Sequence, residues 1–249
     1  MAEPVFRTLE SIAKIAVAAA GTKITYYDLD YIPPHGGAVA AINHTSYIDW
    51  LPAALAAYYR QRRMRFMIKE EMRRVRIINF LIKHTGTIPV NRSAGAQAYA
   101  IAVERLKTGE LVGVYPEATI SRSFELKEFK SGAARMARES NMPIVPIIVW
   151  GAQRIWTKDH PKNLGRSKIP MTVRVGPPLY ADDSVERTNT ALRASMTALL
   201  RQVQQEYPHP TGAFWVPRRM GGSAPTLPEA KALDEAELAE RARRRAERA

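Results

Sequence analysis

Short apolar segments alternate with helix-type segments along this chain of 249 residues, and the alternation constrains its fold more than any other feature. Strands are typically short, apolar and bounded by turn residues. Six segments have this character: residues 36–43, 64–69, 86–91, 110–116, 143–150 and 171–176. Five segments with helical signals lie between or after them: residues 50–59, 70–83, 94–107, 131–141 and 183–207. This order predicts a single α/β domain with a mostly parallel central sheet flanked by helices.

The two ends of the chain have a different character from the middle. Residues 1–22 carry an apolar stripe at helical spacing, but charged residues interrupt it before it reaches the ~20 apolar residues of a membrane span. We expect an amphipathic helix that either packs on the core or lies in a membrane interface. Residues 211–249 contain a Gly- and Pro-rich stretch and then a polar helical segment, which we interpret as a linker and a charged helical tail. The domain itself then spans residues 23–210.

The net charge of +13 is concentrated in the body of the chain, because residues 221–249 hold six basic and six acidic residues. A basic body indicates an anionic partner, either nucleic acid, anionic lipid or a phosphorylated substrate. Residues 60–76 form the densest cluster, with eight basic and two acidic residues interleaved with apolar and aromatic ones. The cluster is an ordinary solvated face, a nucleic-acid patch or a patch for an anionic membrane surface. No RNP, zinc-finger or basic-zipper pattern supports the second, so no nucleic-acid partner is expected. The chain lacks cysteine, which excludes thiolate metal sites and a cysteine nucleophile.

The stretch "AAINHTSYIDWLP", residues 40–52, ends a strand on a histidine, and an aspartate follows five residues later. Ser46 and Asp49 have the spacing of a capping box, which gives Asp49 a purely structural role. Alternatively, His44 is a general base and Asp49 fixes the tautomer of its imidazole. The stretch alone leaves both interpretations open.

Three further segments add to this one: "GTIPVNR" (86–92), "VYPEATISRS" (114–123) and "IVPII" (144–148). With "NHTSYID" they resemble the four ordered blocks of the glycerolipid acyltransferases, the family of 1-acyl-glycerol-3-phosphate acyltransferases. The resemblance runs from about residue 37 to residue 150. It implies transfer of a long-chain acyl group from a thioester, acyl-CoA or acyl-carrier protein, to the free hydroxyl of a lysophospholipid. The most direct acceptor is 1-acyl-glycerol-3-phosphate, which gives phosphatidic acid, and no metal or bound cofactor is expected.

The resemblance also assigns roles to individual residues. His44 would deprotonate the acceptor hydroxyl, and Asp49 would orient it. Arg92 would bind the phosphate of the acceptor, and Glu117 would position the acceptor. Lys69 would contact a phosphate or the donor, and the V-P-I block would line the acyl channel.

The third block departs from the family pattern at two positions. Ala118 stands where the family usually has glycine, and alanine fits easily only if its φ angle is negative. Ile120 stands where the family usually has an arginine, so Arg122 is the candidate to replace that phosphate contact. Otherwise the acceptor carries another head group, as a glycolipid or a different lysophospholipid would.

Both substrates implied by the resemblance partition into membranes. We therefore expect the N-terminal helix and the basic cluster to face a membrane, with the protein peripheral or monotopic on the cytoplasmic face of the cell membrane. The alternative from another class is a non-catalytic membrane- or nucleic-acid-binding protein that uses the basic cluster.

Overall fold

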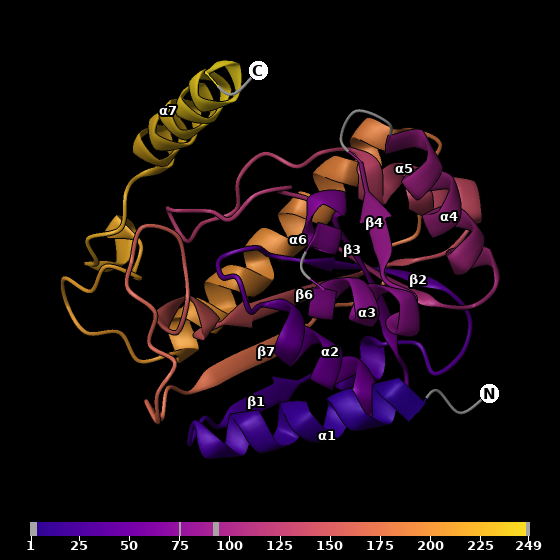
Figure 1. The fold of residues 1–249 in the computed structure, drawn as a ribbon, viewed down its shortest axis with the longest axis horizontal. Helices are drawn as coiled ribbons and strands as arrows, with labels where there is room; N and C mark the ends of the chain where they lie inside the picture. Colours follow the sequence, from indigo (N-terminus) through magenta and orange to yellow (C-terminus); the bar gives the residue numbers. More distant parts are fainter. Residues whose placement is uncertain (1–3, 75, 92–94, 248–249) are drawn as a thin grey trace.

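The computed structural model describes residues 4–74, 76–91 and 95–247, and within these segments seven strands form one sheet with helices on both faces (Figure 1). The strands are β1 (Ile24–Tyr27), β2 (Ala38–Ile42), β3 (Met64–Lys69), β4 (Ile88–Val90), β5 (Leu111–Val114), β6 (Ile144–Trp150) and β7 (Met171–Val175). The α-helices are α1 (Pro4–Ala19), α2 (Trp50–Tyr59), α3 (Arg76–Thr85), α4 (Gly95–Lys107), α5 (Gly132–Ser140), α6 (Val185–Glu206) and α7 (Leu227–Ala246).

The strand order is β1-β7-β6-β2-β5-β3-β4, and the five strands from β6 to β4 run parallel. Strand β7 is antiparallel to β6, and β1 is parallel to β7. The predicted α/β class and mostly parallel sheet are therefore confirmed, and all six predicted strands are present. Strand β1 was not predicted, because three half-buried residues and one exposed residue at the edge of the sheet give only a weak strand pattern. The predicted helix 70–83 is divided into a 3-10 turn, Glu70–Arg74, and α3.

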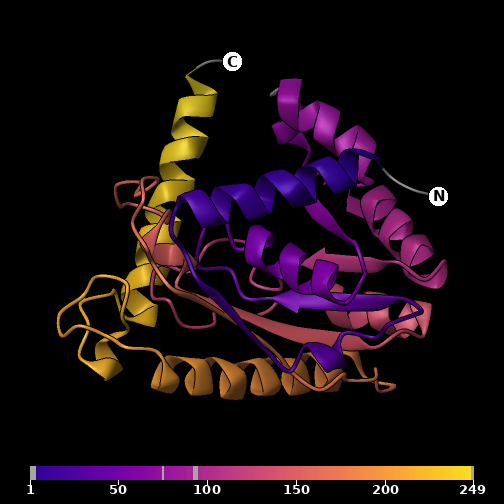
Figure 2. The same cartoon turned by 90° about the horizontal axis from the view of Figure 1, so that it is seen from below.

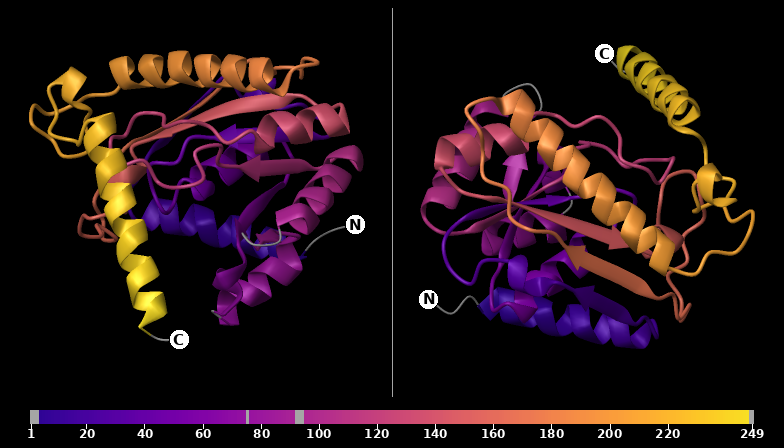
Figure 3. Two further views of the ribbon diagram at one scale, coloured as in Figure 1. Left: turned by 90° about the horizontal axis from the view of Figure 1, so that it is seen from above. Right: turned by 180° about the vertical axis from the view of Figure 1, so that it is seen from behind.

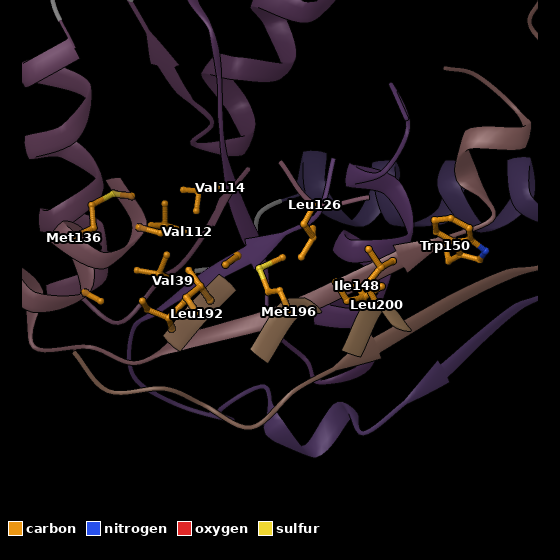
Figure 4. Close-up of a cluster of buried hydrophobic side chains, with 14 of the residues drawn as sticks. Val39, Val112, Val114, Leu126, Met136, Ile148, Trp150, Leu192, Met196 and Leu200 are labelled. Carbon is orange, nitrogen blue, oxygen red and sulfur yellow. The ribbon is translucent and has the colours of Figure 1, made fainter. Parts of the chain in front are cut away.

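Each face of the sheet has its own core, because successive side chains of a strand point to opposite faces. On one face, Val39 and Val112 of the sheet contact the α4, α5 and α6 side of the molecule, where Leu192 and Met196 are buried (Figure 4). On the other face, Ala40 and Ile42 belong to a second cluster that includes the buried alanines of α2. A parallel sheet covered on both faces explains why β2 and β6 are continuous apolar runs, without polar alternation.

Helix α1 runs along the outside of α2 (Figure 2) and is attached by polar contacts. The guanidinium groups of Arg63 and Arg65 lie 5.1 and 5.0 Å from the centre of the Phe6 ring, and Arg63 pairs with Glu10 at 3.3 Å. Ile12 and Ile15 face solvent, with 55% and 68% of their surface exposed. Among the described residues, no helix is long and apolar enough to cross a membrane.

The segment interpreted as a linker is partly core. Trp215 and Val216 are buried, and the indole of Trp215 lies 6.5 Å from that of Trp150 and 4.5 Å from the guanidinium carbon of Arg154. The folded domain therefore continues past residue 210, and the expected boundary there is wrong. Sequence composition missed it because the apolar run "AFWV" is short and lies between prolines and glycines.

We expect Trp215→Ala to lower the free energy of unfolding by about 3–5 kcal/mol, because it removes a large buried aromatic ring and leaves a cavity. Chemical denaturation of the full chain measures this loss. The control is Leu238→Ala, since Leu238 is 60% exposed on α7 and its truncation should change stability by less than about 0.5 kcal/mol. Equal effects of the two substitutions would show that residues 211–224 are a linker after all.

The backbone at Ala118 contradicts the condition set from the sequence. Its φ angle is +60°, in the left-handed region, and its N–H donates to Tyr115 O at 2.9 Å across a tight turn. The third block thus keeps the glycine conformation of the family pattern while carrying an alanine. An L-residue in this region costs roughly 1–2 kcal/mol.

Ala118→Gly should therefore raise the free energy of unfolding by about 0.5–1 kcal/mol, the relieved strain less the extra chain entropy of glycine. The matched control is Ala194→Gly on the exposed side of α6, where helix propensity predicts a loss of about 1 kcal/mol. Thermal or denaturant unfolding of both variants decides the sign. A loss of stability in both would mean that the turn at Ala118 is not strained.

Candidate active site

The candidate site lies where three neighbouring strands end. Strands β6, β2 and β5 are adjacent and parallel, so the residues that follow them emerge at one edge of the sheet. His44 lies two residues after β2, and Glu117 lies three residues after β5. Crevices at the carboxyl ends of parallel strands are where α/β proteins place their ligands.

Asn43 fixes the end of β2 to β6. Its side-chain Nδ2 donates to Val149 O at 3.0 Å, and its Oδ1 accepts from Val149 N at 2.7 Å. The amide is completely buried, and it continues the ladder of the sheet where the backbone of β2 turns away. Asn43 therefore sets the point from which His44 projects, a role that the sequence analysis did not assign. Its only signal was a polar residue at the end of a buried strand.

Asp49 closes the turn before α2 and contacts His44, but it does not cap the helix: α2 begins at Trp50, and the side chain of Asp49 makes no cap bond. Its Oδ2 accepts the backbone N–H groups of Thr45 at 2.8 Å and Ser46 at 2.7 Å, and lies 3.2 Å from His44 Nδ1. The carboxylate is fully buried, whereas the imidazole is 20% exposed. Burial raises the pKa of Asp49, while the bonds from His44 and the two N–H groups oppose that rise. One carboxylate thus both closes the turn and orients the imidazole.

The ring of Tyr115 holds the other side of the imidazole. The two rings are stacked, with centroids 4.0 Å apart and planes inclined by 22°. Within the described residues, His44 Nε2 has no hydrogen bond, so the nitrogen away from Asp49 is available to a substrate. Tyr115 occupies the aromatic position of the third block, which the sequence analysis quoted without giving it a function.

Glu117 holds the peptide of His44. Its Oε1 accepts from His44 N at 2.8 Å and its Oε2 from Lys127 N at 3.1 Å, and the side chain is buried. Burial raises the pKa of Glu117 to about 7, although both N–H bonds lower it. On the other side, Ser121 N donates to His44 O at 2.7 Å. One oxygen of Glu117 therefore holds the backbone of His44 and the other that of Lys127, whereas the prediction was that Glu117 would position the acceptor.

The three other predicted binding residues are placed differently from one another. Arg92 lies outside the described residues. Lys69 ends β3 on the exposed surface and is in register with Val90 of β4.

Ile120, at the position of the missing arginine, is buried. Arg122 is also buried and forms ion pairs with Asp159, Asp234 and Glu237, so it does not present a free guanidinium to a phosphate. Val145 and Ile147 of the V-P-I block are core residues.

A hollow of about 750 Å³ lies elsewhere, between α1, the end of α2 and the start of β3. It is lined by Arg63 and Glu110, which precede the parallel strands β3 and β5. It therefore lies at the opposite edge of the sheet from His44 and is not part of the candidate active site.

The raised pKa of Glu117 predicts a pH dependence of stability. Because the pKa of 4.5 rises to about 7 on folding, protonated Glu117 contributes stability that is complete below pH 4.5 and lost as pH rises through 7. We expect Glu117→Gln to remove this part of the dependence of the free energy of unfolding on pH, which amounts to about 1.4 kcal/mol per pKa unit. Denaturant titrations of wild type and Glu117→Gln between pH 4.5 and about 7 measure this dependence.

The control is Glu104→Gln on the exposed side of α4, which should leave the slope unchanged. Parallel curves for wild type and Glu117→Gln would contradict the assignment of the buried proton to Glu117.

Comparison with known proteins identifies the family. The model of the Acyltransferase family matches residues 23–150. The 1-acyl-sn-glycerol-3-phosphate acyltransferase of Bacillus subtilis is 27% identical over 183 residues, which are 73% of this chain and 85% of that protein. The enzyme of the same name from Borreliella burgdorferi is 26% identical over 165 residues, 65% of each chain.

The fold is shared with a solved structure, the 1-acyl-sn-glycerophosphate acyltransferase of Thermotoga maritima. The TM-score is 0.68 at 20% identity, over 82% of both chains. The family match covers the strands and turns that carry Asn43, His44, Asp49 and Glu117. The resemblance of the four blocks is thereby confirmed, and the chain belongs to the acyltransferase family.

Proposed function

We propose that this chain transfers a long-chain acyl group from a thioester to the free hydroxyl of 1-acyl-glycerol-3-phosphate and so forms phosphatidic acid. The observation that carries the proposal is the His44–Asp49 pair at the end of β2, with Nδ1 directed at a buried carboxylate and Nε2 available. The acceptor is inferred from the relatives in Bacillus subtilis and Borreliella burgdorferi, which are named 1-acyl-sn-glycerol-3-phosphate acyltransferases.

The proposed reaction follows from the geometry of this pair. His44 Nε2 accepts the proton of the acceptor hydroxyl while its oxygen attacks the thioester carbonyl carbon. Asp49 stabilises the imidazolium that forms, because its Oδ2 lies 3.2 Å from Nδ1. The tetrahedral intermediate then expels the thiolate, which recovers the proton from His44 as the thiol. The products are the new ester and a free thiol, and His44 returns to its neutral form.

Direct transfer is favoured over an acyl-enzyme. The chain has no cysteine. Ser46, the nearest serine in sequence to His44, is buried, and its hydroxyl lies 2.6 Å from Trp156 O and 3.1 Å from Ala152 O. That hydroxyl is engaged with the backbone and is not directed at His44.

We propose that the residues at the ends of β3 and β4, at the same edge of the sheet as His44, contact the phosphate of the acceptor and the head of the donor. Lys69 ends β3 in register with Val90, and Arg92 follows β4 by two residues. We keep Arg92 as the proposed phosphate ligand and Lys69 as a proposed contact to phosphate or donor. The donor is acyl-CoA or acyl-carrier protein, and another lysophospholipid or a glycolipid is the alternative acceptor.

His44→Ala should lower kcat by about 10²–10⁴-fold while the protein remains folded, because it removes the general base. Asp49→Asn should also be severely impaired, since an amide can stabilise the wrong tautomer and leaves the two backbone N–H groups less well bonded. The assay uses one long-chain acyl-CoA with either lysophosphatidate or lysophosphatidylinositol, and circular dichroism verifies folding.

Near-normal turnover of folded His44→Ala would refute the chemistry. Wild-type turnover of lysophosphatidylinositol alone would retain the chemistry and replace the acceptor. Loss of stability without loss of specific activity in Asp49→Asn would leave Asp49 only its turn-closing role.

Attachment to an anionic membrane surface, on the cytoplasmic face, is proposed from the exposed side of α1. Ile12 and Ile15 face solvent there, and α1 contacts α3, at whose start the exposed Arg73, Arg74 and Arg76 of the basic cluster lie. An apolar helix face and a nearby polybasic patch are the two signals that stable peripheral attachment generally needs.

Replacing both Ile12 and Ile15 by Asp should weaken binding to anionic vesicles by at least about tenfold, because burying each isoleucine contributes about 1.5–3 kcal/mol. Vesicle sedimentation at low and high salt measures this, and salt should weaken the binding of the wild type. Ile101→Asp on α4, over the other face of the sheet, is the control and should change little. Undiminished binding of the double variant would refute attachment through α1, and tight duplex binding with steep salt dependence would favour the nucleic-acid alternative.

A further inference from the structure

Helix α7 contacts the rest of the molecule mainly along one acidic line, besides an exposed ion pair between Glu229 and Arg218 near its start. It follows the core residue Ala224 and stands apart from α6 and the other helices that cover the sheet (Figure 3). Ala230, Asp234 and Glu237 share one side of the helix, at spacings of four and three residues, and are the residues turned towards the body. Leu233 and Leu238 instead face solvent, with 46% and 60% of their surface exposed. The interface is therefore held mainly by charge.

The acidic line faces a cluster of three cations, Arg122, Lys127 and Lys158. Lys127 Nζ lies 2.7 Å from Asp234 Oδ2, and Lys158 Nζ lies 2.8 Å from Glu237 Oε2. Arg122 Nη2 lies 2.8 Å from Glu237 Oε2, and Arg122 Nη1 also bonds to Asp234. Only 7–20% of each cationic side chain is exposed. Partly buried cations need an anionic partner, and α7 provides two carboxylates.

The cation cluster is connected to His44 through the loop of the third block. Ser121, the neighbour of Arg122, donates its N–H to His44 O at 2.7 Å. Lys127 donates its own N–H to Glu117, the carboxylate that also holds His44 N. An anion bound by this cluster therefore sits on the same short loop that positions the candidate base.

The charge of the acidic line matches that of a phosphate monoester. Two carboxylates supply a charge of −2 at neutral pH, and a phosphate monoester carries about −1.5 to −2. Although burial raises it, bonds from Lys158 and Arg122 lower the pKa of Glu237 to about 2, so this carboxylate stays ionised at neutral pH. A phosphate can therefore replace both carboxylates of α7 without leaving the three cations unpaired, while Asp159 keeps its ion pair with Arg122.

We propose that α7 is an acidic latch: Asp234 and Glu237 occupy a phosphate-monoester site formed by Arg122, Lys127 and Lys158, and a ligand phosphate displaces them. The inference rests on the proposed function only in placing that phosphate on a substrate, either the acceptor or the nucleotide part of the donor. The latch opens because ion pairs at a partly exposed surface are individually weak. Once detached, α7 has lost the contacts of Asp234 and Glu237 with the body, and tertiary contacts supply most of the stability of a helix in a protein.

The first test removes the latch charge. In Asp234→Asn/Glu237→Gln, glycerol 3-phosphate or coenzyme A should bind at least about tenfold more tightly than to wild type, measured by calorimetry at low salt. Glu235→Gln/Glu240→Gln removes the same charge from α7, but neither residue contacts the cation cluster, so it should bind as wild type does. Adding Arg122→Gln to Asp234→Asn/Glu237→Gln should abolish the gain in affinity. Tighter binding of glycerol 3-phosphate assigns the site to the acceptor, and tighter binding of coenzyme A alone assigns it to the donor.

The second test uses the wild-type chain and does not depend on how the variants fold. Saturating glycerol 3-phosphate should accelerate amide hydrogen exchange of residues 227–246 at least several-fold, compared with sodium chloride at equal ionic strength. Glycerol, which lacks the phosphate, should have no effect.

Equal affinities of wild type and both double variants, or unchanged exchange in α7 with phosphate bound, would overturn the latch. Neither readout requires turnover, so a failure of acyl transfer and a failure of the latch are distinguishable.

Discussion

The buried carboxylate of Asp49 is the interaction on which the site depends. It accepts two backbone N–H groups of the turn after β2 and the imidazole of His44 through one oxygen. An ionised carboxylate in a buried position is costly unless hydrogen bonds compensate it, and here each compensating bond also fixes a part of the site. The turn-closing role and the proposed catalytic role of this residue are therefore two consequences of one set of bonds.

Glu117 is a second buried carboxylate, and it extends the same principle to the backbone of His44. It joins the turn after β5 to the turn after β2, while Asn43 joins β2 to β6. Neighbouring parallel strands bring these two turns and the end of β6 to one edge, so residues from distant blocks surround one imidazole. The strained turn at Ala118 lies directly beside Glu117, where strain is tolerated because the surrounding bonds determine the geometry.

The match to the Acyltransferase family covers residues 23–150, and the later part of the chain adds two further sets of contacts. Trp215 closes the end of one core, and α7 places its carboxylates on cations of the third-block loop. The first contribution is hydrophobic and resists salt. The second is electrostatic and is therefore open to competition by other anions, as the proposed latch requires.

The sequence by itself determined the α/β class, the six longer strands and the four blocks, because buried parallel strands are continuous apolar runs and the turns after them carry polar residues at set spacings. It also singled out His44 and Asp49, whose bonds join residues only five positions apart. Only the tertiary structure decided the partners of Glu117 and Arg122, since Glu117 contacts His44 and Arg122 contacts α7, at separations of 73 and more than 110 residues. Local patterns carry no information about such distant pairs, and for this reason a polar helix and a short aromatic run were interpreted as a solvated tail and a linker.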